Sequence, residues 1–374
     1  MTAPTPASST PAPASPALAA PALRSGRPLL TLFVMAYRQR GLVDAAVASA
    51  LAQDWRPLEI VLSDDASPDG TGERLEELAA AYKGPHAVRV NRNPRNTGLT
   101  AHLDRIMQIA EGALLIQNAG DDLSEPDRAS RLFEAWDGGG RRAHLIHTPA
   151  TIIDESGAVV GRKDALAPMR RDPACGPDAA RIIARSLYAL GAASAWTPRL
   201  QQVFGPLGVL GVEDTVIPLR AAALGAAERR AQETGPGAGL LFVDAPLTRW
   251  RAGGLSWSAR EDRRGADYFA PTRRKILGWH ALSHARIAED LERLDFPGRD
   301  AARAINAARR ARLGLEIDLF DRGPLGRLAA GPRALGLSLA RRDATYLRDW
   351  AKHAARPVYA RYLDRTYRPE QLRW

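Results

Sequence analysis

Short apolar runs alternate with amphipathic stretches through the first third of the chain. The runs are rich in Leu, Val and Ile, as strands buried on both faces of a parallel sheet are, and the stretches between them repeat apolar residues at helical spacing. This alternation predicts an α/β fold with a Rossmann-like, doubly wound, mostly parallel sheet. Strands are expected at residues 29–36, 58–62, 87–90 and 113–116, and helices at residues 41–53, 72–82 and 99–111.

The pattern changes after Trp136, where strands become shorter and turns more frequent. Strands are expected at residues 144–153, 158–161, 240–243 and 247–250, and helices at residues 178–188 and from Glu213 onward. From Tyr268 the chain reads as mostly helical, with interruptions at Pro297, Pro324 and Pro357. The predicted organisation is a leader (1–28), an α/β domain (29–260, with halves 29–136 and 137–260) and a basic, mostly helical C-terminal region (261–374).

Composition narrows the class of protein. Of the 374 residues, 45% are hydrophobic and 25% charged, which is typical of a globular protein with a large core. The leader consists almost entirely of Ala, Pro, Ser and Thr and is expected to be disordered rather than a secretory signal. Cys175 is the single cysteine, which excludes an intramolecular disulfide and fits a reducing compartment. No apolar run is long enough to span a membrane, so a cytoplasmic location is expected.

The net charge of +10 is unevenly distributed. From Arg260 onward there are 25 basic and 15 acidic residues, whereas the preceding residues carry 27 of each. No aromatic-basic motif accompanies this excess, so nucleic-acid binding is not expected. Residues 325–339 are apolar with arginines on or near them, as in a segment that lies on an anionic membrane surface. The alternative is a helical bundle that closes the acceptor side or packs in a homo-oligomer.

Two adjacent carboxylates, Asp121 and Asp122, follow the apolar run that ends at Ile116, and Pro126 then precedes an amphipathic stretch. Proline favours the first position of a helix, so the pair is expected on the loop between a strand and a helix. Ligands bind at this edge of an open α/β sheet, and hard oxygen donors suit a divalent cation together with phosphate. Aspartates also cap helices and fill turns, which is the competing interpretation.

Further motifs occur in a fixed order around this pair. They are Tyr37-Arg38 after the first strand, Asp64-Asp65-Ala66-Ser67-Pro68-Asp69-Gly70-Thr71 after the second, Asn96-Thr97-Gly98 before a helix, Pro126-Asp127-Arg128, and Glu213-Asp214. In this order the motifs resemble those of the inverting family-2 nucleotide-sugar glycosyltransferases, which have a GT-A fold. The resemblance covers residues 29–256, about two thirds of the chain.

The resemblance implies a nucleotide site on the first half of the domain. Asp65 corresponds to the carboxylate that binds the base or ribose, and Tyr37 to a residue that flanks the base. Asp64 belongs to the same motif and more plausibly shapes its loop, while Asn96 and Gly98 let the chain turn beside the nucleotide. The alternatives are an aromatic residue packed on a neighbouring loop and an ordinary helix start.

The metal and acceptor sides depart from the family pattern. Asp121, with Asp122 beside it, corresponds to the carboxylate that meets Mg²⁺ or Mn²⁺ on the diphosphate, but Ala119 stands where the family usually has a first Asp. Asp214 corresponds to the general base, paired with Glu213; the competing interpretation is a pair of carboxylates at a helix start. Trp196, Trp250 and Arg251 are expected on the acceptor side, although Trp196 could equally be a core residue and Arg251 could face the diphosphate. The His that often follows this Trp-Arg pair is absent.

These features together predict a metal-dependent hexosyltransferase-like enzyme of cell-surface polysaccharide or glycolipid synthesis. The expected donor is a nucleotide-diphosphate sugar, with a UDP-sugar as the first candidate, and the expected acceptor is a sugar or a lipid-linked molecule. Peripheral contact with the inner face of the membrane would bring the enzyme to a lipid-linked acceptor. Two alternatives stay open. One is an inactive nucleotide-sugar-binding module of the same fold, and the other is a sugar-phosphate nucleotidyltransferase, which would want a Gly-rich phosphate loop after the first strand.

Overall fold

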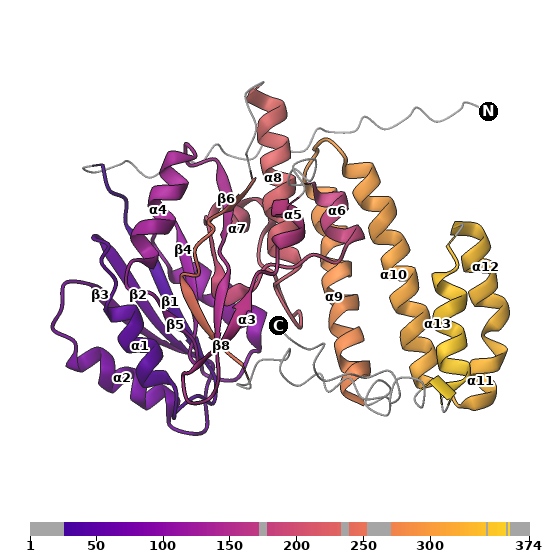
Figure 1. Cartoon of the computed structure of the whole chain (residues 1–374), viewed down its shortest axis with the longest axis horizontal. Coiled ribbons are helices and arrows are strands. Elements are labelled where there is room, and N and C mark those ends of the chain that lie inside the picture. Colours follow the sequence, from indigo (N-terminus) through magenta and orange to yellow (C-terminus); the bar gives the residue numbers. More distant parts are fainter. Residues whose placement is uncertain are drawn as a thin grey trace, which may run out of the picture.

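A seven-stranded sheet forms the centre of the molecule (Figure 1). The computed structural model describes residues 26–171, 178–232, 239–252, 271–341, 343–356 and 358–359. All neighbouring strands of the sheet are parallel except at β9, which runs antiparallel to β4 and β6. The strand order is β10 (Gly239–Phe242), β6 (Ala143–His147), β9 (Ser194–Trp196), β4 (Leu115–Ala119), β1 (Leu30–Ala36), β2 (Leu58–Asp64) and β3 (Ala87–Arg92).

Alternate residues of the buried strands face two separate hydrophobic cores, as the twofold repeat of a strand requires. In β1, Leu32 and Val34 contribute to one core, whereas Phe33 and Met35 contribute to the other. The first core is covered by α1 (Val43–Leu51), α2 (Thr71–Ala81) and α4 (Arg128–Gly138). The second is covered by α3 (Leu99–Ile109), α6 (Ala179–Ala184), α7 (Arg199–Phe204) and α8 (Val216–Gln232), and α5 (Ala167–Arg171) adds Met169 to it. The predicted fold class is confirmed.

A second, four-stranded sheet lies beside the first and corrects one prediction. Its order is β5 (Leu123–Ser124), β11 (Thr248–Arg251), β7 (Ala150–Ile153) and β8 (Val159–Lys163). The single strand expected at residues 144–153 is therefore two strands in two sheets. The break falls at Thr148, whose N–H donates to the carbonyl of Ala193 at 3.0 Å, and at Pro149, which has no N–H to continue a ladder.

Two helix starts also differ from prediction. Pro126 does not open α4, because β5 pairs with β11 first and the helix begins at Arg128. Glu213 and Asp214 lie in the turn before α8 rather than in its first turn, and the carbonyl of Glu213 accepts the N–H groups of Val216 and Ile217. Both acidic pairs are therefore on loops, where their backbone is free of helical constraints.

The C-terminal region is helical, as predicted, but the boundary at residue 260 does not separate two independent cores. Ile287 and Leu291 of α9 and Ala302 of α10 belong to the second core of the main sheet. Leu315, Leu319 and Tyr346 belong to a small core of their own at the other end of α10. The helices are α9 (Pro271–Arg293), α10 (Arg299–Asp321), α11 (Pro324–Ala329), α12 (Gly331–Arg341) and α13 (Thr345–Ala354). In the described part of the chain, none of the helices has both the length and the apolar character needed to cross a bilayer.

A buried ion pair fastens α9 to the α/β domain. The guanidinium of Arg220 in α8 meets the carboxylate of Asp290 in α9 through two hydrogen bonds of 2.7 and 3.0 Å, and both side chains are almost fully buried. Arg220 also donates to the carbonyl of Gly205 at 2.8 Å. Burial acts to raise the pKa of Asp290, and the hydrogen bonds and charge of Arg220 oppose that rise.

Removing one partner of this pair leaves a buried charge without compensation. We expect Asp290→Ala to lower the free energy of unfolding by about 3–5 kcal/mol, measured by urea denaturation. The matched control is Asp295→Ala, because Asp295 pairs with Arg230 of the same helix α8 but at a site where both side chains are 62% exposed. That change should cost about 1 kcal/mol or less. Equal losses in the two variants would contradict the proposed role of burial.

Candidate active site

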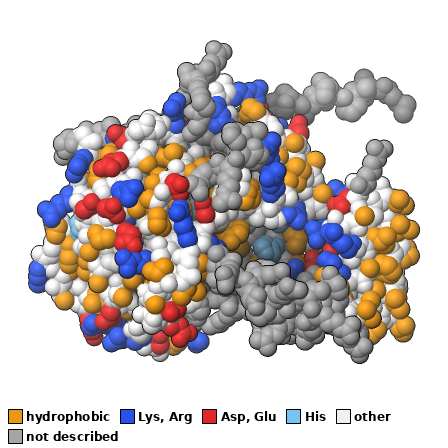
Figure 2. Space-filling view, viewed as in Figure 1, with side chains coloured by type: hydrophobic (Ala, Val, Ile, Leu, Met, Phe, Trp, Pro, Cys, Tyr) orange, Lys and Arg blue, Asp and Glu red, His pale blue; other side chains and the backbone are white. Residues whose placement is uncertain are grey.

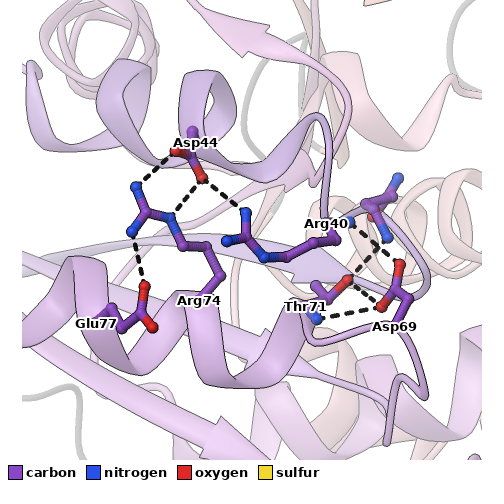
Figure 3. Close-up of polar contacts among 7 residues, drawn as sticks. Arg40, Asp44, Asp69, Thr71, Arg74 and Glu77 are labelled. Carbon is purple, nitrogen blue, oxygen red and sulfur yellow. Dashed lines mark hydrogen bonds and ion pairs between the residues drawn. The ribbon is translucent and has the colours of Figure 1, made fainter.

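The loops that follow β1 and β2 are tied together by polar contacts (Figure 3). The side chain of Asp69 accepts hydrogen bonds from Thr71, from its N–H at 3.1 Å and its hydroxyl at 2.6 Å, and from the N–H of Arg40 at 3.3 Å. The N–H of Gln39 in turn donates to the Thr71 hydroxyl at 3.0 Å. Ser67 accepts from the N–H of Arg38 at 2.9 Å. These contacts explain the polar residue types of this motif, whose side chains fix the edge of the sheet.

The two aspartates at the end of β2 have different surroundings. Asp65 accepts hydrogen bonds from the side chain of Asn93 at 2.8 Å, from the Thr97 hydroxyl at 2.9 Å and from the N–H of Gly98 at 2.9 Å. Burial acts to raise the pKa of Asp65, but these hydrogen bonds outweigh burial and lower it. Asp64 is fully buried, with one carboxylate oxygen bonded to the N–H of Ser67 and the other without a partner among the described residues. Of the two aspartates, Asp64 therefore has the carboxylate oxygen that lacks a hydrogen-bond partner, and that oxygen is buried.

The remaining nucleotide-side predictions lie around this point. Gly98 has φ +85°, a conformation that favours glycine, and it begins α3 directly after the contact with Asp65. Asn96 is exposed two residues before it. Tyr37 follows β1 and is partly exposed, and the guanidinium of Arg38 lies 5.5 Å from the centre of its ring. The structure thus gathers Tyr37, Asp64, Asp65, Asn96 and Gly98 onto loops at the carboxyl ends of β1, β2 and β3.

Asp121 and Asp122 are both buried at the carboxyl end of β4. Burial raises the pKa of Asp121, and burial together with the neighbouring charge of Asp121 raises the pKa of Asp122 well above its usual value. One oxygen of Asp122 accepts the N–H of Arg251 at 2.8 Å. Two ionised carboxylates in this position repel each other, and a divalent cation would relieve that repulsion.

The donor set at this pair fits an ion shared with a ligand. Within the described residues no group of three or more His, Cys, Asp or Glu side chains is arranged to hold a metal ion by itself. Mg²⁺ is commonly held by one or two carboxylates with phosphate oxygens and water completing its coordination. Asp121 is the better placed ligand, because an oxygen of Asp122 is already bonded to Arg251.

Glu213 and Asp214 form a second acidic pair, of which Glu213 is buried. Glu213 accepts a hydrogen bond from Gln117 of β4 at 3.2 Å, and its other oxygen has no partner among the described residues. Asp214 is half-buried and accepts the N–H of Gly191 at 3.2 Å. Burial raises the pKa of both groups, and the charge of Glu213 raises that of Asp214 further. Asp214 is thus the member of the pair that combines partial exposure with an elevated pKa, the properties a general base needs.

Lys163 of β8 is a site residue that the sequence did not reveal. Its ammonium group lies 4.5 Å from the centre of the Trp250 ring and 5.8 Å from that of Tyr188. Burial lowers the pKa of Lys163, and the charge of Asp214 acts in the opposite direction. No local motif distinguishes this lysine, since β8 joins the site only through the second sheet.

Two acceptor-side predictions need correction. Trp196 is 1% exposed and packs edge-on against Phe33 at 5.9 Å between ring centres, so it is a core residue and cannot stack on a sugar. Arg251 is buried and its guanidinium donates to the carbonyls of Asp121, Asp154 and Glu155 at 2.7–3.1 Å, so it fastens the acidic loop to a hairpin. Trp250 is nearly buried, with Lys163 over its ring. The segment 253–256 lies outside the described residues.

Arg128 connects the two acidic pairs. It is fully buried, donates to the Ser124 hydroxyl at 3.0 Å and to the carbonyl of Ala192 at 2.8 Å, and its charge acts on Asp122. Ala192 follows Gly191, whose N–H bonds Asp214. Burial lowers the pKa of Arg128 to about 9. The motif Pro126-Asp127-Arg128 could have identified this residue, since an Arg so close to an acidic loop has an obvious partner.

Comparison with known proteins finds similarity over the first half of the α/β domain. The sequence profile described as "Glycosyl transferase family 2" matches residues 31–162. EpsE of Bacillus subtilis is 28% identical over 130 residues, 35% of this chain and 46% of that protein. Succinoglycan biosynthesis protein ExoO of Rhizobium meliloti is 33% identical over 134 residues, 34% of this chain and 35% of that protein. The matched part of the chain thus spans less than half the length of these relatives.

Among solved structures, TarS residues 1–349 of S. aureus in complex with UDP-GlcNAc superimposes with a TM-score of 0.48 at 15% identity, covering 90% of this chain and 88% of that one. A similarity of this degree bears on neither activity nor ligand. The sequence match spans the loops after β1, β2 and β3 and the acidic loop after β4. Residues 31–162, about a third of the chain, are thus similar to glycosyl transferase family 2.

Proposed function

We propose that this protein is an inverting glycosyltransferase that moves a sugar from a nucleotide-diphosphate donor to an acceptor hydroxyl. The observation that carries the proposal is that Arg128 links two acidic pairs, Asp121-Asp122 and Glu213-Asp214. Its charge acts on Asp122, and it donates to the segment 191–194, which contacts Asp214. One pair is suited to a cation on the diphosphate, and the other offers a base with an elevated pKa. The similarity of residues 31–162 to glycosyl transferase family 2 supports the same reaction class.

Transfer requires one displacement at the anomeric carbon. Asp214 accepts the proton of the acceptor hydroxyl while the acceptor oxygen attacks that carbon. The bond from the carbon to the diphosphate oxygen breaks on the opposite side, and its electron pair leaves with the nucleoside diphosphate. A single in-line displacement inverts the anomeric configuration. Glu213, held by Gln117, keeps Asp214 in a negative environment, and the nearby Lys163 favours its ionised form.

A divalent cation, Mg²⁺ or Mn²⁺, would be held by Asp121 with Asp122 beside it, and when bound it supplies positive charge to the departing diphosphate. The absence of a carboxylate at Ala119 leaves the donor sugar with fewer contacts than the family pattern provides. The side chain of Gln39 hydrogen-bonds Asp121 and so helps to position it. Because Gln39 follows β1, the loop after that strand positions the proposed metal ligand Asp121.

The donor is proposed to be a UDP-sugar, bound with Asp64, Asp65 and Tyr37 around the nucleoside. Support comes from the partly exposed ring of Tyr37, which follows β1 beside the loop after β2. The acceptor is proposed to be a growing polysaccharide or a lipid-linked sugar. The relative ExoO carries the name of succinoglycan biosynthesis, and a further relative over 100 residues, 31% identical, is the chondroitin synthase of Pasteurella multocida; the match covers 27% of this chain and 10% of that protein.

Substitution of the proposed base tests the reaction. We expect Asp214→Asn to lower the turnover of a nucleotide sugar by about 100-fold or more, because a positioned general base contributes about that factor. Asp121→Ala should abolish the metal-dependent part of the rate. The measurement is diphosphate release from a panel of UDP-, GDP- and dTDP-sugars. Asp137→Asn, a change on the exposed surface of α4, is the matched control and should be neutral. Unchanged turnover in both site variants would remove the site assignment.

The metal site can be tested without an assay of activity. In saturating UDP, Mn²⁺ at 100 times its dissociation constant should stabilise the wild type by about 2.7 kcal/mol, seen as a higher melting temperature that EDTA reverses. Asp121→Asn should remove this effect. In EDTA at pH 7 the variant should be at least as stable as the wild type, because the loss of one charge ends the repulsion with Asp122. An equal response to Mn²⁺ in the wild type and in Asp121→Asn would refute the assignment.

The elevated pKa of Asp214 predicts the acid limb of the pH profile. Only the ionised carboxylate accepts a proton, so the rate should fall as pH drops through this raised pKa, at a higher pH than for an ordinary aspartate. Lys163→Met removes a positive charge that favours ionisation, and should therefore move the acid limb to still higher pH. Lys352→Met, a change in the distant helix α13, serves as control. If the acid limb does not move in Lys163→Met, the charge of Lys163 does not act on Asp214 as proposed.

A further inference from the structure

The outer end of the C-terminal region carries an exposed apolar surface that the proposed reaction does not use. Figure 2 shows hydrophobic side chains in a column along the edge of the molecule where Figure 1 places α12. Four leucines of α11 and α12 have high exposed fractions, and they are called the leucine face below. They are Leu325 (83%), Leu328 (56%), Leu335 (47%) and Leu339 (70%).

The leucine face is not a consequence of loose packing. In α12, Ala334 and Ser338 are buried toward α13, where the Ser338 hydroxyl accepts the N–H of Leu347 at 3.0 Å. The indole N–H of Trp350 donates to the carbonyl of Arg327 at 2.7 Å, which fixes the end of α11. Ala334, Ser338 and the partly buried Leu337 thus make the inner contacts of α12, while Leu335 and Leu339 are exposed. The helix carries more apolar residues than its inner face uses.

The charge around the leucine face is positive on balance. From Asp318 to Lys352 the chain has six arginines and one lysine against four aspartates. Arg322 and Arg333 form ion pairs with Asp318 of α10, at 3.0 and 2.9 Å, so part of their charge is offset. Arg327 donates to the carbonyl of Arg322, and Arg341 is exposed at the end of α12. Figure 2 shows basic side chains beside the apolar column.

We propose that the leucine face docks onto an anionic lipid surface. Exposed leucines on a basic background match the acyl region and the headgroups of such a bilayer. A second copy of the chain is a poorer occupant, because a twofold contact would bring two positively charged surfaces together. In Figure 1 helices α11 and α12 lie at the opposite end of the molecule from the main sheet, so docking through them would not cover that sheet. This inference is independent of the transferase activity.

Vesicle binding of the full chain tests the proposal. The wild type should float with vesicles of one part phosphatidylglycerol to three parts phosphatidylcholine, and far less with phosphatidylcholine alone or at high salt. Leu325→Gln with Leu339→Gln should reduce binding by about tenfold or more. The matched control is Val159→Gln with Val160→Gln, because these valines of β8 are exposed to a similar degree (66% and 55%) and lie away from α12. The control should bind as the wild type does.

The outcomes separate the possible occupants. A wild type that stays with the soluble fraction overturns the proposal, as does a leucine variant that floats as the wild type does. If ultracentrifugation shows a concentration-dependent dimer that the leucine variant loses, and vesicles bind neither protein, the face is an interface between copies. Unchanged melting temperatures in both double variants would show that these comparisons concern folded protein.

Discussion

The buried guanidinium of Arg128 is the contact on which the geometry of the site depends. Arg128 donates one hydrogen bond to the hydroxyl of Ser124, beside the acidic loop, and another to the carbonyl of Ala192. Ala192 follows Gly191, whose N–H donates to Asp214. A positive charge inside the protein is costly unless neighbouring groups compensate it, and here the compensation comes from Asp122 and the carbonyls. The charges of Asp122 and Arg128 therefore depend on each other. A change in the acidic loop alters the environment of Arg128, and through Arg128 it affects the segment beside the proposed base Asp214.

A second connection runs through α3. Asp65 receives the N–H of Gly98 at the start of this helix, and further along it Asp104 accepts the N–H groups of Leu207 and Gly208, both at 2.7 Å. The loop so held leads within a few residues to Glu213. One helix thus spans from the proposed nucleoside side to the proposed base, so the two ends of the site are positioned by a rigid element rather than by independent loops.

The sequence predicted most of the strands and helices and the acidic loops, because these depend on local hydrophobic periodicity and on motifs of consecutive residues. It did not separate β6 from β7, since the change of sheet at Thr148 depends on a contact with Ala193 far along the chain. Trp196 was ambiguous for a similar reason: a tryptophan looks the same in a core and in a sugar site until its neighbours are known. Lys163 left no local signal, because its role arises where β8 meets β11 through the fold.

Helix α10 sets the distance between the core of the main sheet and the small C-terminal core. Its first turn contributes Ala302 to the core of the main sheet, and its last turns contribute Leu315 and Leu319 to the small core that carries α11 and α12. At 1.5 Å per residue, its 23 residues span about 35 Å. A bilayer docked at the leucine face would thus stand about one helix length from the core of the main sheet. If the proposed transfer uses an acceptor anchored in that bilayer, the acceptor must extend over about that length to bring its hydroxyl to the acidic pairs.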